Sequence, residues 1–185
     1  MTKEVKTDAF TWIHKPSLYI QDEEKFILET EPFTEFNPKD ATYAPIELYF
    51  DVEAPFMFTM KVEYHYNTVF DQCGMVFYTD HERKAIVGTE YQDIEMQKLH
   101  CTVFHELDGD RSEKNISSSI ETMYYRIWCR SNAVRIQHSF NGNRFFDLRK
   151  FKVPEDSVCS VGIYACSPTH SSFDSTFSKM ILNGE

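Results

Sequence analysis

The sequence predicts an all-β protein built as a sandwich of two antiparallel sheets. Three observations lead to this fold class. Apolar and polar residues alternate with a period of two along many segments, aromatic residues make up 15% of the chain, and no segment shows a convincing helical pattern. About ten or more such strands, each with one apolar face, are best buried by stacking two antiparallel sheets. A closed barrel would bury the same faces, and alternation alone does not separate the two.

In the N-terminal half, the clearest strand is Phe56–Tyr66. Its residues at even positions are apolar or aromatic, whereas Thr59, Lys61 and Glu63 lie on the other face. The stretch from Ile46 to Val52 repeats this pattern. Further strands are expected over residues 19–20, 25–30, 72–79 and 85–92.

In the C-terminal half, the turn signals connect the strands into a meander. Ser131-Asn132 separates two alternating runs, and Asn141-Gly142 supplies the backbone freedom that a tight hairpin turn needs. Residues 107–121 form the longest polar stretch and are expected to be a mobile surface loop. The strands expected in this half are 96–105, 123–129, 134–140, 144–149, 158–166 and 172–182.

Length, charge and cysteine content limit the class of protein. A chain of 185 residues suits one domain, and we expect an N-terminal tail at 1–9 followed by a domain at 10–185. The net charge of −10 argues against a nucleic-acid partner. No apolar run reaches the roughly 18 residues of a membrane span, and the polar first ten residues contain no secretory signal. Five cysteines without a C-x-x-C pair indicate reduced thiols in a cytoplasmic protein.

The segment 90–95 contains acidic residues that could form a glycosidase site. Glucanase-type sandwiches place their catalytic carboxylates on alternate residues of one strand. Here Asp93 and Glu95 share a face with Tyr91, so Glu90 would need a bulge to join them. The alternative is that Glu90 ends a strand and Asp93-Ile94-Glu95 form a turn. We favour this alternative and assign no catalytic residues.

The sequence indicates neither a metal site nor a cofactor. His100 points away from Cys101 on a strand, and Cys101 lies about 13 Å from His105 at the usual rise per residue. Asp108-Gly109-Asp110 lacks the later bidentate acid of a calcium loop. We therefore expect no metal ligands and no cofactor.

Several short motifs together resemble a known family. In order and spacing they are similar to the regulation-of-enolase protein family of the concanavalin A-like lectin/glucanase superfamily. The resemblance runs from about Phe10 to Leu182. The motifs that carry it are Thr34-Glu35-Phe36, Phe70-Asp71-Gln72-Cys73-Gly74-Met75-Val76, Val87-Gly88-Thr89-Glu90-Tyr91, Ser139-Phe140-Asn141-Gly142-Asn143-Arg144-Phe145 and Val161-Gly162-Ile163-Tyr164-Ala165-Cys166-Ser167-Pro168.

The resemblance implies a jelly-roll sandwich whose concave face binds sugars in many members of the superfamily. It also implies a ligand site in which polar side chains form hydrogen bonds with sugar hydroxyls and one aromatic ring stacks on the sugar. The alternative is that the polar residues are buried and hydrogen-bonded and only support the fold. The residues concerned are Glu35, Tyr43, Asp71, Gln72 and Glu90.

The chain departs from the family pattern at three places. Asn37 stands where the family has Trp, the long polar segment lacks an expected Ser-Asp-Trp, and Ile86 stands where the family has Lys. Ile86 would deprive Glu90 of a cation, so we expect the site to be altered or lost.

The sequence as a whole therefore predicts a non-catalytic module for a carbohydrate or a sugar-derived metabolite. One alternative is an interaction protein that regulates a metabolic enzyme. Another is a glycoside hydrolase that uses Glu90 or Glu95 with Asp93. A nucleic-acid or membrane partner is not expected.

Overall fold

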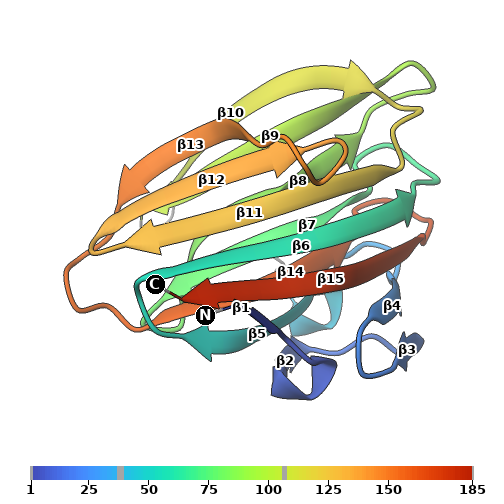
Figure 1. Ribbon diagram of the computed structural model, residues 1–185. Coiled ribbons are helices and arrows are strands. Elements are labelled where there is room, and N and C mark those ends of the chain that lie inside the picture. The colour runs from blue at the N-terminus through green and yellow to red at the C-terminus, as the bar shows by residue number, and fades with distance from the viewer. Residues whose placement is uncertain (1, 37–39, 106–107, 185) are drawn as a thin grey trace.

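The computed structural model describes residues 2–36, 40–105 and 108–184. Two stacked antiparallel sheets make up the molecule, as Figure 1 shows. In the described ranges, the helical structure consists of two short 3-10 turns, Thr7–Ala9 and Ala41–Tyr43. The predicted all-β sandwich is confirmed, and neither sheet closes into a barrel.

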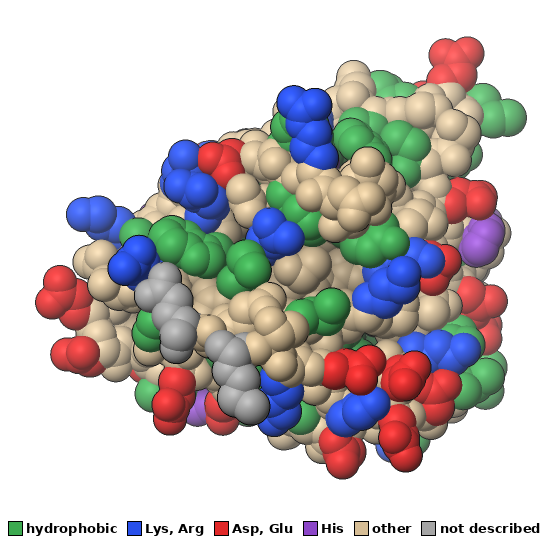
Figure 2. Space-filling model, in the orientation of Figure 1, with side chains coloured by type: hydrophobic (Ala, Val, Ile, Leu, Met, Phe, Trp, Pro, Cys, Tyr) green, Lys and Arg blue, Asp and Glu red, His purple; other side chains and the backbone are tan. Residues whose placement is uncertain are grey.

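The eight-stranded sheet is built around the C-terminal meander and the long strand β6. Its order is β13-β12-β11-β6-β15-β4-β3, and β1 adds to β15. The outer face of this sheet is turned toward the viewer in Figures 1 and 2. Its strands are β1 (Thr2–Glu4), β3 (Tyr19–Gln21), β4 (Phe26–Glu29), β6 (Phe56–His65), β11 (Thr122–Arg130), β12 (Ala133–Ser139), β13 (Phe146–Lys152) and β15 (Asp174–Gly184).

The seven-stranded sheet lies behind it, in the order β10-β9-β8-β7-β14-β5-β2. Its strands are β2 (Thr11–His14), β5 (Ile46–Val52), β7 (Gln72–Thr79), β8 (Glu82–Tyr91), β9 (Met96–His105), β10 (Asp108–Ser117) and β14 (Cys159–Cys166).

The core lies between the two sheets and is formed by the apolar positions of the predicted alternation. Phe58, Met60 and Val62 of β6 are fully buried there, as are Tyr125 and Ile127 of β11. All five cysteines are buried free thiols. Because side chains alternate along a strand, the residues between these core positions form the outer faces.

One hairpin differs from its prediction in detail. The predicted turn between β12 and β13 is present, but it runs over residues 140–145 instead of two residues. Only Gly142 among these has a positive φ, of 76°. The Ser139 hydroxyl and the Asn141 side chain accept the free backbone N–H groups of the turn. Side-chain capping therefore replaces the expected two-residue geometry.

The prediction of a mobile loop over residues 107–121 is wrong. Residues 108–117 form the edge strand β10, which pairs with β9 along its whole length. Its residues are polar on both faces because one face is exposed and the other reaches Arg149 of β13 through Asp110 and Ser112. An edge strand of this kind buries little apolar surface, so it leaves no alternation in hydrophobicity.

The first residues take part in the sandwich. β1 pairs with β15, and Val5 is 4% exposed. The division into a tail at 1–9 and a domain at 10–185 stays a prediction. Within the described ranges, no helix has the length and apolar character that crossing a membrane requires.

Candidate functional site

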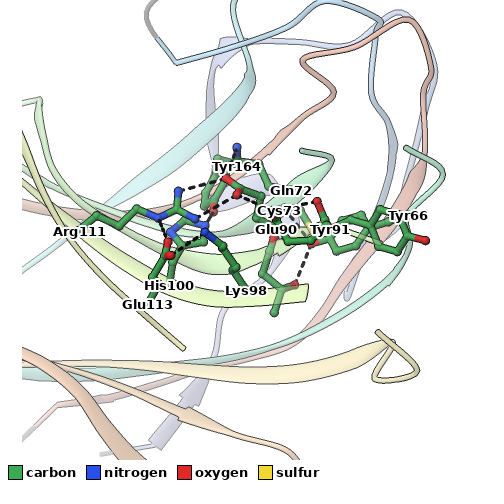
Figure 3. Close-up of polar contacts among 12 residues, drawn as sticks. Tyr66, Gln72, Cys73, Glu90, Tyr91, Lys98, His100, Arg111, Glu113 and Tyr164 are labelled. Carbon is green, nitrogen blue, oxygen red and sulfur yellow. Dashed lines mark hydrogen bonds and ion pairs between the residues drawn. The ribbon is translucent and has the colours of Figure 1, made fainter. Parts of the chain in front are cut away.

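The outer face of the seven-stranded sheet brings together residues from four neighbouring strands. Directly opposite one another lie Gln72 of β7, Glu90 of β8 and Lys98 of β9. One step along the strands, His100 of β9 lies opposite Glu113 of β10. On β7, β8 and β9 these residues alternate with buried residues, so their side chains project away from the other sheet, and Glu113 lies on the same face. Figure 3 shows them gathered on this face.

Glu90 and Arg111 form the centre of this arrangement. Nη1 and Nη2 of Arg111 each donate to one carboxylate oxygen of Glu90, both at 3.1 Å. The amides of Gln92 and Gln72 donate to the same carboxylate at 2.9 and 3.4 Å. Glu90 is 8% exposed. A bidentate ion pair with added amide donors compensates for the burial of a carboxylate.

A second carboxylate shares the same guanidinium. Nε of Arg111 donates to Glu113 at 2.7 Å, and Nζ of Lys98 donates to Glu113 at 2.6 Å. The hydrogen bond from Lys98, and then that from Arg111, lower the pKa of Glu113. Burial by itself would lower the pKa of Arg111, but its bonds to Glu90 and Glu113 raise it overall. We call Gln72, Glu90, Gln92, Lys98, Arg111 and Glu113 the Glu90–Arg111 cluster.

Next to this cluster, two facing glycines make room for a tyrosine. Gly74 of β7 lies opposite both Gly88 of β8 and Tyr164 of β14. A Cβ on Gly88 would lie 2.3 Å from the Tyr164 hydroxyl, so a side chain there would displace the ring. The Tyr164 hydroxyl lies 3.3 Å from Nε2 of His100. The glycines therefore allow an aromatic ring to lie flat across the sheet.

His100 is a neutral residue in this network. It is 0% exposed, and burial, followed by the charges of Arg111 and Lys98, lowers its pKa to about 3. Its Nδ1 is buried without a hydrogen-bond partner in the described part of the chain. Cys101, by contrast, lies in the core on the other face. The two residues therefore cannot share a metal ion.

A separate charged pair lies further along the same face. Arg83 donates to both carboxylate oxygens of Glu47, at 2.9 and 2.7 Å, and the Tyr78 hydroxyl donates to Glu47 at 3.0 Å. The Arg83 guanidinium lies 4.7 Å from the ring of Phe36, which packs at 4.9 Å against Tyr164. Phe36 thus bridges this pair to the tyrosine beside the Glu90–Arg111 cluster.

The structure brings Gln72 and Glu90 together but separates the other predicted site residues from them. Asp71 is 0% exposed, and its carboxylate accepts the backbone N–H groups of Asn67 and Thr68 at 2.9 and 2.8 Å. It therefore closes a loop. Glu35 is an exposed loop residue, Tyr43 is the exposed last residue of the 3-10 turn Ala41–Tyr43, and a backbone hydrogen bond of 2.8 Å joins them. Among the described residues, neither side chain bonds to the Glu90–Arg111 cluster.

The expectation that Glu90 lacks a cation is wrong. Ile86 does lie on the outer face, but Arg111 of β10 supplies the positive charge. Arg111 was missed because its segment was taken for a loop. The alternation of Arg111 and Glu113 around Ser112 is the signal that could have found it, and in the structure these two residues lie opposite Thr102 and His100 of β9. Asn37, which stands where the family has Trp, lies outside the described residues.

The glucanase-type row is replaced by a turn. β8 ends at Tyr91, and the Asp93 carboxylate accepts the backbone N–H groups of Glu95 and Met96, both at 2.9 Å. This is the turn that we favoured from the sequence. An Asp used in this way supports the chain reversal between β8 and β9.

A cavity of about 1050 Å³ lies at the other end of β14 from the Glu90–Arg111 cluster. It is formed by residues 51–55, 130–132 and 153–159, and it includes Asp51, Glu53, Glu155 and Asp156. None of its lining residues is aromatic. It therefore offers no ring on which a sugar could stack.

Comparisons with known proteins place this fold in a family. Residues 12–184 match the model described as "Protein of unknown function (DUF1349)". The chain belongs to this family. It is 24% identical to "Regulation of enolase protein 1" of Saccharomyces cerevisiae over 190 residues, which cover 98% of this chain and 92% of that protein. The predicted resemblance to the regulation-of-enolase family is confirmed.

Solved structures show the same fold. A functionally unknown protein from Saccharomyces cerevisiae superimposes with a TM-score of 0.80 and 23% identity, covering 97% of this chain and 98% of that one. A GH43 glycoside hydrolase gives a TM-score of 0.74 at 16% identity, but this chain spans 41% of its length. An alginate lyase from Klebsiella pneumoniae gives 0.63 at 9% identity, covering 87% of this chain and 81% of that one. At these identities the likeness concerns the fold alone.

Proposed function

We propose that the protein is a non-catalytic binding module for a carbohydrate or sugar-derived metabolite, and that the ligand contacts the Glu90–Arg111 cluster. The observation that supports this most is the bidentate Glu90–Arg111 pair with amides of Gln72 and Gln92 on the same carboxylate. Carboxylate, amide and guanidinium groups side by side offer the mixed donors and acceptors that sugar hydroxyls require. Two carboxylates balanced by Arg111 and Lys98 favour an uncharged ligand.

The same contacts argue against catalysis. A glycosidase needs one carboxylic acid that holds its proton near neutral pH, usually because burial or a like charge raises its pKa. The pKa of Glu113 is lowered instead. Glu90 is committed to two bonds with Arg111. Neither carboxylate is placed to donate a proton to a leaving group.

The proposal is tested by titrating uniformly ¹⁵N-labelled protein with gluco-, xylo- and uronate oligosaccharides and following the amide spectra. We expect one class of neutral saccharide to shift amides of β7, β8 and β10. Gln72→Ala and Glu90→Gln should each weaken that binding about fivefold, since one lost hydrogen bond is worth about 1 kcal/mol. Gln137→Ala, which removes an outer-face amide from the other sheet, is the matched control and should change nothing. If no saccharide shifts any amide, the proposal fails.

A second candidate function is regulation of a metabolic enzyme through a protein interface. It is favoured by one observation, the name of the Saccharomyces relative that matches 98% of this chain. A binding experiment with purified enolase checks it directly. Absence of a complex at micromolar concentrations of both proteins would count against enolase as the partner.

A further inference from the structure

The charge of the molecule is divided very unevenly along the chain. Residues 122–152 contain seven Arg and Lys residues and a single acidic residue, Asp147, which gives +6. The whole chain carries −10, so the remaining residues carry −16. These 31 residues form β11, β12 and β13. A basic region therefore occupies one part of an acidic protein.

Most of the basic side chains of this region lie on the outer face of the eight-stranded sheet. Trp128 of β11 lies opposite Arg135 of β12, which in turn lies opposite Lys150 of β13. In Figure 2, Lys and Arg side chains stand among hydrophobic ones over these strands, whereas acidic side chains gather toward the N-terminal strands. We call Tyr124, Arg126, Trp128, Arg135, Phe145 and Lys150 the basic–aromatic face.

The arginines of this face lie against aromatic rings. The guanidinium carbon of Arg126 lies 3.5 Å from the ring centre of Phe145, and that of Arg135 lies 5.3 Å from Trp128. Stacking on a ring holds the planar guanidinium in a fixed orientation with its N–H groups available at the edge. The two arginines are thus ordered before any partner arrives.

The cations of this face outnumber the carboxylates that could neutralise them. Asp147 forms ion pairs with both Lys150, at 2.7 Å, and Arg135, at 3.8 Å. Arg126 donates to the Thr59 hydroxyl at 3.2 Å and has no ion pair within the described ranges. Burial lowers the pKa of Arg126, as expected for a charge without a nearby anion. The basic–aromatic face therefore lacks about two negative charges, counting one for each unmatched cation.

We propose that the basic–aromatic face docks an acidic segment of a partner protein. Arg, Trp and Tyr are the residues that contribute most to protein–protein interfaces, and oriented guanidinium groups bind carboxylates in a bidentate manner. Two copies of this face would repel each other. Pairing it with the acidic part of a second copy would give a head-to-tail contact, which forms a ring or an open chain instead of the commoner two-fold dimer, so a different protein is the better occupant.

A nucleic acid fits this face less well. The guanidinium groups of Arg126 and Arg135 cover the rings on which bases would stack. The −16 charge of the remaining chain also opposes the approach of a polyphosphate. Carboxylates on a protein segment bond to the N–H groups at the edge of a guanidinium group, so they do not need an uncovered ring.

The test uses a peptide of sixteen glutamates as the probe and calorimetric titration of the full chain at low salt. We expect binding that weakens as salt rises. Arg126→Gln/Arg135→Gln should lower the affinity about tenfold, and the corresponding Arg→Lys pair should recover only part of it because lysine lacks the planar fork. Far-ultraviolet circular dichroism confirms that each variant is folded.

The matched control is Lys25→Gln/Lys84→Gln, which changes the net charge equally but lies outside the basic–aromatic face. It should alter the affinity less than about twofold. Equal weakening by both pairs, tighter binding of a sixteen-nucleotide single strand than of the peptide, or no peptide binding at all would each overturn the proposal. Glu90→Gln should leave peptide binding unchanged, so this result is independent of the proposed saccharide site.

Discussion

The two outer faces of the sandwich treat their charged residues in opposite ways. On the seven-stranded sheet, Arg111 bonds to both Glu90 and Glu113, and Lys98 also bonds to Glu113. On the eight-stranded sheet, Arg126 and Arg135 lie against Phe145 and Trp128 instead. The same period-two strands produce both faces. The neighbouring side chains decide whether a cation is neutralised within the protein or lies against an aromatic ring.

This difference has a structural reason. Cross-strand neighbours on one face lie about 5 Å apart, so a carboxylate on the adjacent strand reaches a cation directly. β8 and β10 supply Glu90 and Glu113 on either side of β9, and Arg111 reaches Glu90 across β9, whereas the strands beside Arg126 present Thr59 of β6 and Gln137 of β12. Stability is therefore expected to depend on cations of the first face and partner binding on those of the second.

Arg111→Ala is the largest expected effect on stability. It leaves Glu90, 8% exposed, without its cation, and the desolvated carboxylate should cost about 2–3 kcal/mol of unfolding free energy. Urea unfolding at neutral pH measures this. The double variant Arg111→Ala/Glu90→Gln should regain more than half of the loss, because the uncompensated charge is gone. A single-variant loss below about 1 kcal/mol would contradict the view that the cluster is held by this pair.

Acidification should lower the stability of the protein through one buried histidine in each sheet. His100 has its pKa lowered to about 3, and His138 on β12 has its pKa lowered to about 4, in both cases first by burial. Each stays neutral in the folded protein while the unfolded chain takes up a proton below about pH 6.5. Stability is therefore fully present above that pH and falls as pH drops toward the folded pKa, by about 1.4 kcal/mol per pH unit for each histidine.

Urea unfolding at pH 6.5, 5.5 and 4.5 checks this slope. His100→Gln should reduce the slope of unfolding free energy against pH by the contribution of one histidine. His100→Gln/His138→Gln should reduce it by the contribution of two. The single variant tests the seven-stranded sheet, because His100 bonds to Tyr164 there, whereas His138 lies 3.1 Å from Lys114. An unchanged slope in His100→Gln would mean that this histidine is protonated in the folded protein.

Arg135→Ala should have the smallest effect on stability. Its side chain is 42% exposed, and its ion pair with Asp147 is 3.8 Å long, so the loss should stay below about 1 kcal/mol. Replacing Arg by Ala is thus expected to cost much stability on one face and little on the other. Thermal unfolding of both variants under one condition makes the comparison. A loss as large as that of Arg111→Ala would remove the distinction between the faces.

The candidate site was only partly predictable from the sequence. Gln72 and Glu90 were identified through the family motifs and do lie opposite each other. Asp71 precedes β7 by one residue, and its carboxylate closes the loop before that strand. Arg111 was missed because an edge strand with polar residues on both faces carries no hydrophobic pattern.

The sequence by itself determined which strands have an apolar face. Those strands in turn predict the sandwich. The period of two in hydrophobicity is a local property, and burying those faces leaves two stacked sheets as a solution. The tertiary structure alone decided the pairing of strands far apart in the chain. Arg111 meets Glu90 across β9, and Phe145 folds back over Arg126. These contacts depend on register and on turn geometry, which no local pattern contains.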